Sequence, residues 1–322
     1  MEEDYPKTLL EFEDRFSTEA SCVEYLRTLR WPEGFICPRC GAKDAWHTNR
    51  GLLHCIECGM QTSVTAGTIL HRTRKPLRLW FRAMWHITNQ KYGANALGLQ
   101  RALNFGSYHT AWQWLHKLRR AMVRPGRDKL NGVVEVDETY VGGKKPGKRG
   151  RGAEGKALVG IAVEDKDEEG LGRIRLQHLE DASGTSLIPF VKGVVQTGSI
   201  IRTDDWSGYN SLTKNNFRHV VIQTKDLKLA HLVAALMKRW LLGTYQGAAR
   251  PSHLSYYLDE YTFRFNRRTS ASRGKLFYRL VQQVMMVDPA PANMLKGPAL
   301  PFLAATDNLN LDPVDEDRDH NT

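Results

Sequence analysis

The stretch GVVEVDETYVGG, residues 132–143, decides the fold because it places acidic side chains within an apolar strand. In a strand with a period of two, Val134 and Val136 share one face, whereas Glu135 and Asp137 share the other. A carboxylate in the middle of a strand needs a partner, since an unpaired buried charge is strongly unfavourable. We therefore take Asp137 as the first candidate site residue.

A second stretch, SIIRTDDWSGY, residues 199–209, repeats this arrangement, and its apolar strand ends at Asp204. Two strands that carry carboxylates near their ends could converge on hard divalent cations, which prefer oxygen ligands. Mg²⁺ ions bridged by carboxylates catalyse two-metal phosphodiester chemistry. The alternative is that DDWSGY is only a polar turn between a strand and a helix.

A basic loop follows the first strand, and residues 142–156 hold six basic side chains against one acid. A polyanionic substrate at an acidic metal site needs such cations, which hold the phosphates that carboxylates would repel. The alternative is an ordinary solvated basic run. The candidate DNA contacts in the loop are Lys144, Lys145, Lys148, Arg149 and Arg151.

Composition and charge favour a nucleic-acid partner. The chain has 322 residues, a formal net charge of +11 and a pI of about 9.4. This length allows two or more domains, and the excess of basic residues indicates a polyanionic partner. The sequence has no apolar run of about 18 residues, and its acidic N-terminus does not resemble a signal peptide, so we expect a cytoplasmic protein without membrane contact.

Four of the five cysteines form two CxxC pairs, Cys37 with Cys40 and Cys55 with Cys58, separated by 14 residues. Two such pairs can place four thiolates around one Zn²⁺ ion, with the intervening hairpin forming a zinc ribbon. Such a closed site is structural and indicates binding rather than catalysis. Unrelated buried thiols or a redox CxxC are the alternatives.

Changes in composition divide the chain into five segments. A helical pattern covers residues 1–30, the zinc ribbon 31–70, and three short helices of helix-turn-helix type 71–125. Residues 131–285 alternate strands and helices as in an α/β domain. Residues 286–322 form a C-terminal extension that becomes acidic from residue 306, and we expect it to be flexible.

These motifs together resemble the insertion-sequence transposases of the ISXO type, which belong to the DDE superfamily. The resemblance covers roughly residues 20–270 and is most specific in YYLDEYTFRFNRR near its end. It implies an RNase H-like catalytic core, with a mixed five-stranded sheet and helices, after the zinc ribbon and the helical unit. Asp137 matches the first acidic position of the family and Asp204 the second.

The third position of the family lies near a helix start, seven residues before a Lys. Counted back from Lys238, it falls on His231. Seven residues turn a helix by about 700°, so both side chains lie on one face. Imidazole suits Mn²⁺ better than Mg²⁺, and Glu260 is the alternative third residue.

The predicted core has strands at 132–141, 157–164, 172–180, 199–204 and 218–223, and helices at 183–196, 207–214 and 229–242. In the RNase H-like order, the first strand lies beside the strand after the first helix, which brings Asp137 and Asp204 together. The helix at the family block ends in cations, and the remaining candidate DNA contacts are Lys238, Arg239, Arg264, Arg267 and Arg268.

The resemblance implies metal-dependent cleavage of element ends and transfer of the 3′-OH strand into target DNA. It also implies a prokaryotic, nucleoid-associated protein that forms a homo-oligomer on double-stranded DNA. Two alternatives stay open: a zinc-ribbon DNA-binding or regulatory protein with a decayed core, and a metal-dependent nuclease without strand transfer.

Overall fold

The computed structural model describes residues 3–124, 126–142, 156–246, 250–270 and 272–296. Its helices are α1 (Leu9–Arg15), α2 (Glu19–Arg30), α3 (Leu77–Asn89), α4 (Ala96–Leu103), α5 (Tyr108–Ala121), α6 (Gly184–Val194), α7 (Lys228–Tyr245), α8 (Leu254–Phe265), α9 (Arg273–Val284) and α10 (Ala292–Lys296). Its strands are β1 (Ala45–His47), β2 (Leu53–Cys55), β3 (Gln61–Thr62), β4 (Val133–Val141), β5 (Ala157–Asp165), β6 (Leu171–Leu179), β7 (Ile200–Thr203) and β8 (Arg218–Val221).

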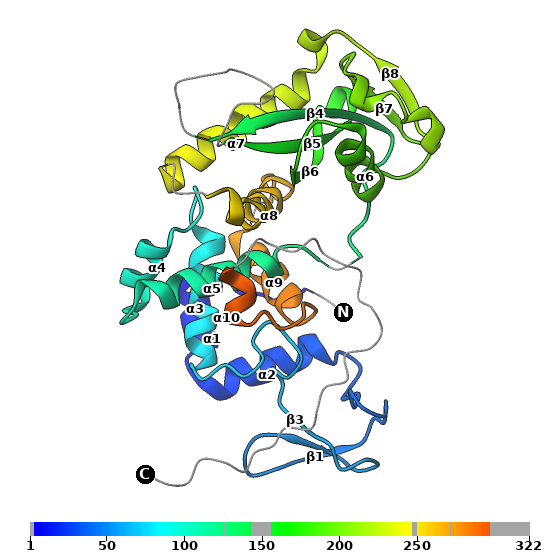
Figure 1. The fold of residues 1–322 in the computed structure, drawn as a ribbon. Coiled ribbons are helices and arrows are strands. Elements are labelled where there is room, and N and C mark those ends of the chain that lie inside the picture. The colour runs from blue at the N-terminus through cyan, green and yellow to red at the C-terminus, as the bar shows by residue number, and fades with distance from the viewer. Residues whose placement is uncertain (1–2, 125, 143–155, 247–249, 271, 297–322) are drawn as a thin grey trace.

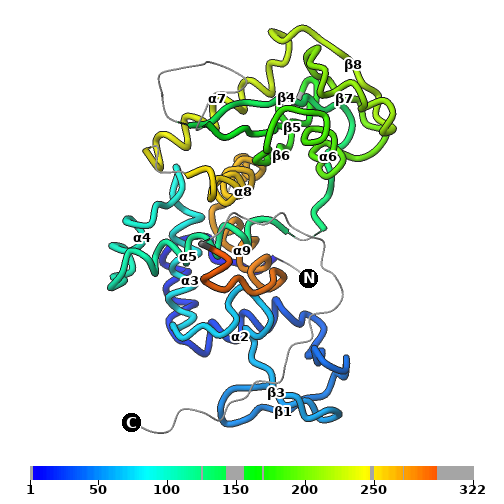
Figure 2. The backbone as a smooth tube through the Cα atoms, in the orientation of Figure 1, coloured from blue at the N-terminus to red at the C-terminus, as the bar shows by residue number. Residues whose placement is uncertain are grey.

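The molecule has three tiers, which Figures 1 and 2 show from the same side. The small β1-β2-β3 sheet lies at the bottom, a helical unit in the middle, and the larger sheet with α6 and α7 at the top. Helix α8 lies between the helical unit and the large sheet and contacts both α5 and β6.

The large sheet has the strand order β6-β5-β4-β7-β8. Strands β4, β5 and β6 pair antiparallel in sequence, whereas β7 and β8 are parallel to β4. This mixed order is that of an RNase H-like core, as the sequence predicted. The predicted adjacency of the first strand and the strand after α6 is confirmed, because Val133 pairs with Ile200 and Glu135 with Arg202.

The two faces of the sheet are buried under different helices because strand side chains alternate between them. Val134 and Val136 pack with α6 and the turns after β7. On the other face, Val159 and Ile161 of β5 pack with α7 and α8. Helix α7 therefore lies on the face of β4 that carries Glu135 and Asp137.

Helix α9 belongs to the core of the helical unit, although the sequence placed residues 131–285 in the catalytic domain. Phe277 of α9 is fully buried, and its ring lies 5.4 Å from that of Phe12 and 5.8 Å from that of Phe81. Leu295 of α10 is buried in the same cluster. The chain thus returns to the helical unit after α8, and local periodicity alone does not reveal which core a helix joins.

The predicted helix at 207–214 is wrong. The structure has two short 3₁₀ turns there, Ser207–Tyr209 and Thr213–Asn215. The segment SGYNSLTKNN is rich in Gly, Ser and Asn, which are poor helix formers because they favour turns. The third helix of the helical unit, α5, is capped by Ser107, whose hydroxyl accepts a hydrogen bond from the His109 amide.

None of the helices within the described ranges is long and apolar enough to cross a bilayer.

Replacing Phe277 by Ala tests the position of α9. The lost ring would leave a cavity among four aromatic neighbours, and we expect the free energy of unfolding to fall by about 3–5 kcal/mol. Denaturant titration measures this change. Leu242→Ala is the control, because that side chain is 68% exposed on α7 and its removal should change stability by less than about 0.5 kcal/mol.

Candidate metal sites

Three alternate side chains of β4 face α7. Glu135 contacts the start of α7, Asp137 lies beside His231, and the Thr139 hydroxyl accepts a 2.6 Å hydrogen bond from Lys238 Nζ. Because residue numbers increase together on both elements, α7 runs along β4 in the same direction. One strand face thus presents its polar groups to one helix face.

Glu135 fixes the start of α7. Its side chain is buried, and Oε2 accepts 2.9 Å hydrogen bonds from the backbone amides of Leu229 and Ala230. The first amides of a helix have no intrahelical partner, and the helix dipole favours an anion there. Burial raises the pKa of Glu135, while the two amide bonds oppose that rise. The cap holds His231, one residue after Ala230, over Asp137.

The distance from His231 Nε2 to Asp137 Oδ2 is 3.4 Å. The Asp137 side chain is 14% exposed, whereas the His231 side chain is 44% exposed. Asp137 Oδ1 accepts a hydrogen bond from the Glu138 amide, which fixes the carboxylate within the strand. His231 thus has an open side from which a substrate can approach, and Asp137 forms the floor of the site.

Asp204 lies at the end of β7, the parallel neighbour of β4. Its Oδ1 accepts a hydrogen bond from the Trp206 amide, and Trp206 Nε1 donates a 2.6 Å bond to the Ala182 carbonyl. Gly208 permits this packing, because a Cβ there would lie 2.7 Å from the same carbonyl oxygen. The turn after β7 is therefore anchored, and Asp205 beside it is exposed.

Asp204 is close enough to Asp137 to influence its ionisation. The pKa of Asp137 is raised to about 6, mainly by burial and also by the charges of Glu138 and Asp204, while the Glu138 amide and His231 oppose the rise. The site thus concentrates carboxylates from β4 and β7 in a partly desolvated position. Such a group is stabilised by a divalent cation, and its oxygen donors with one imidazole suit Mg²⁺ or Mn²⁺.

Sequence reasoning missed Tyr209 as a part of this site. Its buried hydroxyl donates a 2.7 Å hydrogen bond to Glu138 Oε2, on the opposite side of β4 from Asp137. Glu138 therefore points away from α7, as the strand period predicted. The sequence held a signal for Tyr209, because the stretch SIIRTDDWSGY carries it together with Asp204. A buried tyrosine is, however, ordinarily a core residue.

Glu260, the alternative third residue, is not part of this group. It is fully buried, accepts a 2.8 Å bond from Arg119 Nε and a 2.9 Å bond from Arg264 Nε, and also bonds the Tyr245 hydroxyl. None of these partners is Asp137, Asp204 or His231. Glu260 instead joins α8 to α5.

The structure corrects the expectation that Arg264 contacts phosphate. Its side chain is 11% exposed, and besides Glu260 it donates to the carbonyls of Gln90 and Ile87 at the end of α3. Arg268 donates to the carbonyls of Leu171 and Gly172 at the start of β6 but keeps an exposed surface. Arg264 is therefore a structural residue.

Lys238 and Arg239 are exposed on α7. Burial lowers the pKa of Lys238, while the charge of Asp137 opposes that change, so the ammonium group lies near the carboxylate site. The predicted loop contacts Lys144, Lys145, Lys148, Arg149 and Arg151 fall outside the described residues.

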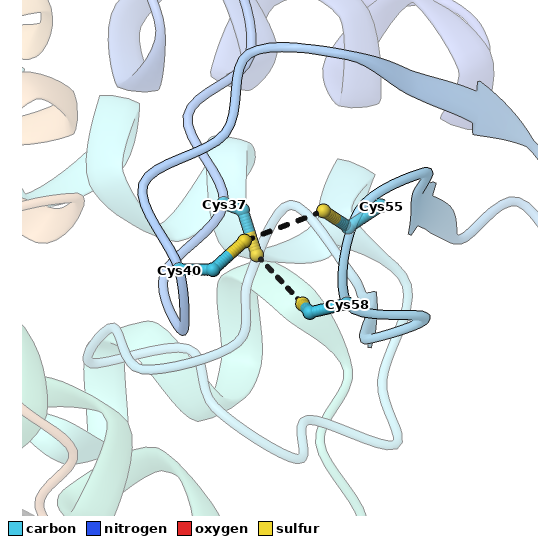
Figure 3. Close-up of side chains that lie close together, drawn as sticks. All are labelled: Cys37, Cys40, Cys55 and Cys58. Atoms are coloured by element: carbon cyan, nitrogen blue, oxygen red, sulfur yellow. Dashed lines mark hydrogen bonds between the residues drawn. The ribbon is translucent and has the colours of Figure 1, made fainter.

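The four predicted zinc ligands come together in the ribbon (Figure 3). Their sulfur atoms all lie within 4.8 Å of one another, and the Cys37–Cys58 and Cys40–Cys55 pairs are each 3.6 Å apart. Tetrahedral Zn–S bonds of ~2.3 Å place sulfur atoms ~3.8 Å apart. The cluster therefore fits one structural zinc ion. Arg30 of α2 donates to the carbonyls of Ser63 and Ala66, which ties the ribbon to the helical unit.

Two protein-family models match parts of this chain. Residues 129–266 match the ISXO2-like transposase domain, and residues 17–61 match the transposase zinc-ribbon domain. The chain therefore contains an ISXO2-like transposase domain and, before it, a transposase zinc ribbon. These two matches cover the strands that carry Asp137 and Asp204, helices α7 and α8, and all four cysteines.

A relative described as an uncharacterized protein in transposable element ISH50, from Halobacterium salinarum, is 29% identical over 141 residues, which are 42% of this chain. The chain spans 45% of that relative's length.

Two solved structures show weaker likeness. One is the simian T-cell lymphotropic virus intasome in complex with the PP2A regulatory subunit B56 gamma, with 15% identity, a TM-score of 0.25, and coverage of 68% of this chain and 72% of that one. The other is the Mos1 strand transfer complex, with 11% identity, a TM-score of 0.26, and coverage of 64% and 74%. These scores are too low to define a shared architecture.

Replacing Cys37 by Ser should remove the zinc ion. We expect about one zinc per chain in the unaltered protein and much less than one in the variant, measured by elemental analysis after dialysis, because the four thiolates act together. Cys22→Ser is the matched control. Cys22 is fully buried in α2 and lies outside the cluster, so its variant should keep zinc even where the new hydroxyl lowers stability.

The raised pKa of Asp137 predicts a pH-dependent response to metal. Without metal, the unfolded state loses this proton first, so stability should fall as pH rises from about 4 to about 6, by roughly 2 kcal/mol in all. Mn²⁺ needs the carboxylate, so it should raise the melting temperature above pH 6 and have little effect below it. Asp137→Asn should remove both effects in thermal melts, and an unchanged Mn²⁺ response would contradict the assignment.

Proposed function

We propose that the chain is a DNA transposase that cleaves element ends with divalent metal ions and transfers the 3′-OH strand into target DNA. The observation that carries this proposal is the 3.4 Å approach of His231 on α7 to Asp137 on β4, beside the parallel strand β7 that ends at Asp204, within an ISXO2-like transposase domain. The proposed ligands of the metal ions are these three side chains.

Bound divalent ions would activate the attacking oxygen and stabilise the leaving oxygen at the scissile phosphate. Asp137 supplies a fixed carboxylate, because the Glu138 amide and the strand restrict its rotation. Asp204 supplies a second from an anchored turn, and the cap by Glu135 positions His231.

Nearby cations would bind the phosphates of the substrate. Lys238 lies two helical turns beyond His231 on the same face of α7, and Arg239 is exposed beside it. A cation there offsets the repulsion between DNA and the carboxylates, since the Coulomb interaction is strong at a partly desolvated site. We also propose the loop at 142–156 as a DNA contact, on its sequence and its position after β4.

The zinc ribbon and the helical unit would bind the element ends. Helices α4 and α5 are joined by a short turn at 104–107, and the first turn of α5 exposes Tyr108 and His109. This is the geometry in which a second helix can enter the major groove. Joining two ends requires at least two active sites, so we propose a homo-oligomer on DNA.

Cleavage of labelled DNA that carries the element ends tests the proposal. With Mn²⁺ or Mg²⁺, we expect nicking and strand joining, and Asp137→Ala or Asp204→Ala should lower the cleavage rate by at least about a hundredfold while binding persists. Asp205→Ala is the matched control, because Asp205 is the exposed neighbour of Asp204.

Other outcomes separate the alternatives. Binding without cleavage by the unaltered protein would indicate a DNA-binding protein with a decayed core, and nicking without joining would indicate a nuclease. His231→Ala should reduce cleavage, and full activity of that variant would remove His231 from the site.

A further inference from the structure

A second concentration of charge lies at the junction between the helical unit and the large sheet. A cavity of about 570 Å³ opens there between the segment after α5, strand β6, the end of α8 and helix α9. Six arginines line it: Arg124, Arg127, Arg173, Arg175, Arg267 and Arg279. Asp128 is the one acidic residue in the described lining.

Three of these arginines have carboxylate partners. Arg173 bonds Glu164, Arg279 bonds Glu3, and Arg124 lies 3.4 Å from Asp128. These pairs hold three of the six guanidinium groups in place.

Arg175 and Arg267 are held by backbone and ring contacts, whereas Arg127 lies near a carboxylate. Arg175 is 5% exposed and donates to the carbonyls of Ile174 and Asp128. Arg267 donates to the Phe263 carbonyl and lies 4.0 Å over the ring of Phe263. Arg127 interacts electrostatically with Asp259. A guanidinium has five N–H donors, so Arg175 and Arg267 keep donors that these contacts do not use.

Neighbouring positive charges add to the effect of burial on two of these arginines. The pKa of Arg175 is lowered to about 10, mainly by burial and also by the charges of Arg127 and Arg173, while Glu164 and Asp128 oppose the change. Burial likewise lowers the pKa of Arg267 to about 10, with contributions from Arg279 and Arg124. A bound anion would relieve this repulsion.

We propose that this arginine cavity is a phosphate-binding site that holds a backbone phosphate of DNA at the junction. Arginine suits phosphate because its planar donors can form paired hydrogen bonds with two oxygens. A nucleotide would also need a surface for its base, but the one aromatic side chain in the described lining, Phe263, has its ring covered by Arg267. The lining therefore favours a backbone phosphate over a free nucleotide.

The inference rests on the proposed function in one respect, which is that DNA is the molecule that carries the phosphate. Held at this junction, DNA would contact the segment that follows α5 together with β6, which carries no residue of the carboxylate site. The site is thus separate from the metal ligands, and its loss should weaken DNA binding without changing the metal response of Asp137.

The double variant Arg127→Gln/Arg267→Gln tests the cavity. At constant ionic strength, replacing chloride by inorganic phosphate should raise the melting temperature of the unaltered protein but not that of the double variant. Arg218→Gln is the matched control, because Arg218 is exposed on β8 and should leave the response unchanged. An equal phosphate response in the double variant would overturn the proposal, and the single variant Arg267→Gln serves where the double variant fails to fold.

A second experiment identifies whether the bound phosphate belongs to DNA or is a free anion. Binding of a labelled double-stranded oligonucleotide is measured over a range of salt concentrations, where each lost phosphate contact lowers the slope of log K against log salt by about 0.9. We expect the double variant to lose about one such unit and to bind roughly tenfold more weakly. A lost phosphate response with an unchanged slope would assign the cavity to a free anion and reject DNA.

The two proposals fail in different experiments. Absence of cleavage by the unaltered protein would reject the transposase activity. The salt slope and the phosphate response would then still test whether the cavity binds phosphate. Full cleavage with an unchanged slope in the double variant would reject the cavity alone.

Discussion

The pair of hydrogen bonds to Glu135 at the start of α7 is the interaction on which the proposed catalytic site depends. A helix beginning on the surface of a sheet could rotate or slide, and either motion would carry His231 away from Asp137. Two hydrogen bonds that consecutive backbone amides donate to Glu135 fix both the rotation and the height of α7 over β4. The same face of β4 also carries Asp137 and Thr139. This one strand therefore positions the proposed metal ligand Asp137, the start of α7, and the ammonium group of Lys238.

A second constraint joins the catalytic sheet to the helical unit. The buried Glu260 of α8 bonds Arg119 of α5 and Arg264, and Arg264 in turn reaches the end of α3. A buried ion pair loses much of its value to desolvation, but removing one partner leaves an isolated charge. The network therefore fixes how the helical unit sits against the sheet more than it adds to stability. The arginine cavity lies at the same junction, so the proposed phosphate would contact both the helical unit and the large sheet.

The sequence predicted most of the fold because its patterns are local. Alternation in β4 separated Val136 from Asp137, and the paired CxxC spacing predicted the cysteine cluster. Two features were beyond such patterns. The cap by Glu135 joins residues more than ninety positions apart, and α9 returns to the helical core through contacts that no nearby residue signals.

Anomalous diffraction from crystals of the protein soaked in Mn²⁺ tests the central claim most directly. The account predicts a peak within bonding distance of the carboxylates of Asp137 and Asp204, with His231 as a neighbour, and no peak there in Asp137→Ala. Peaks bound only elsewhere on the chain, or a peak that persists in the variant without either carboxylate as a ligand, would contradict it.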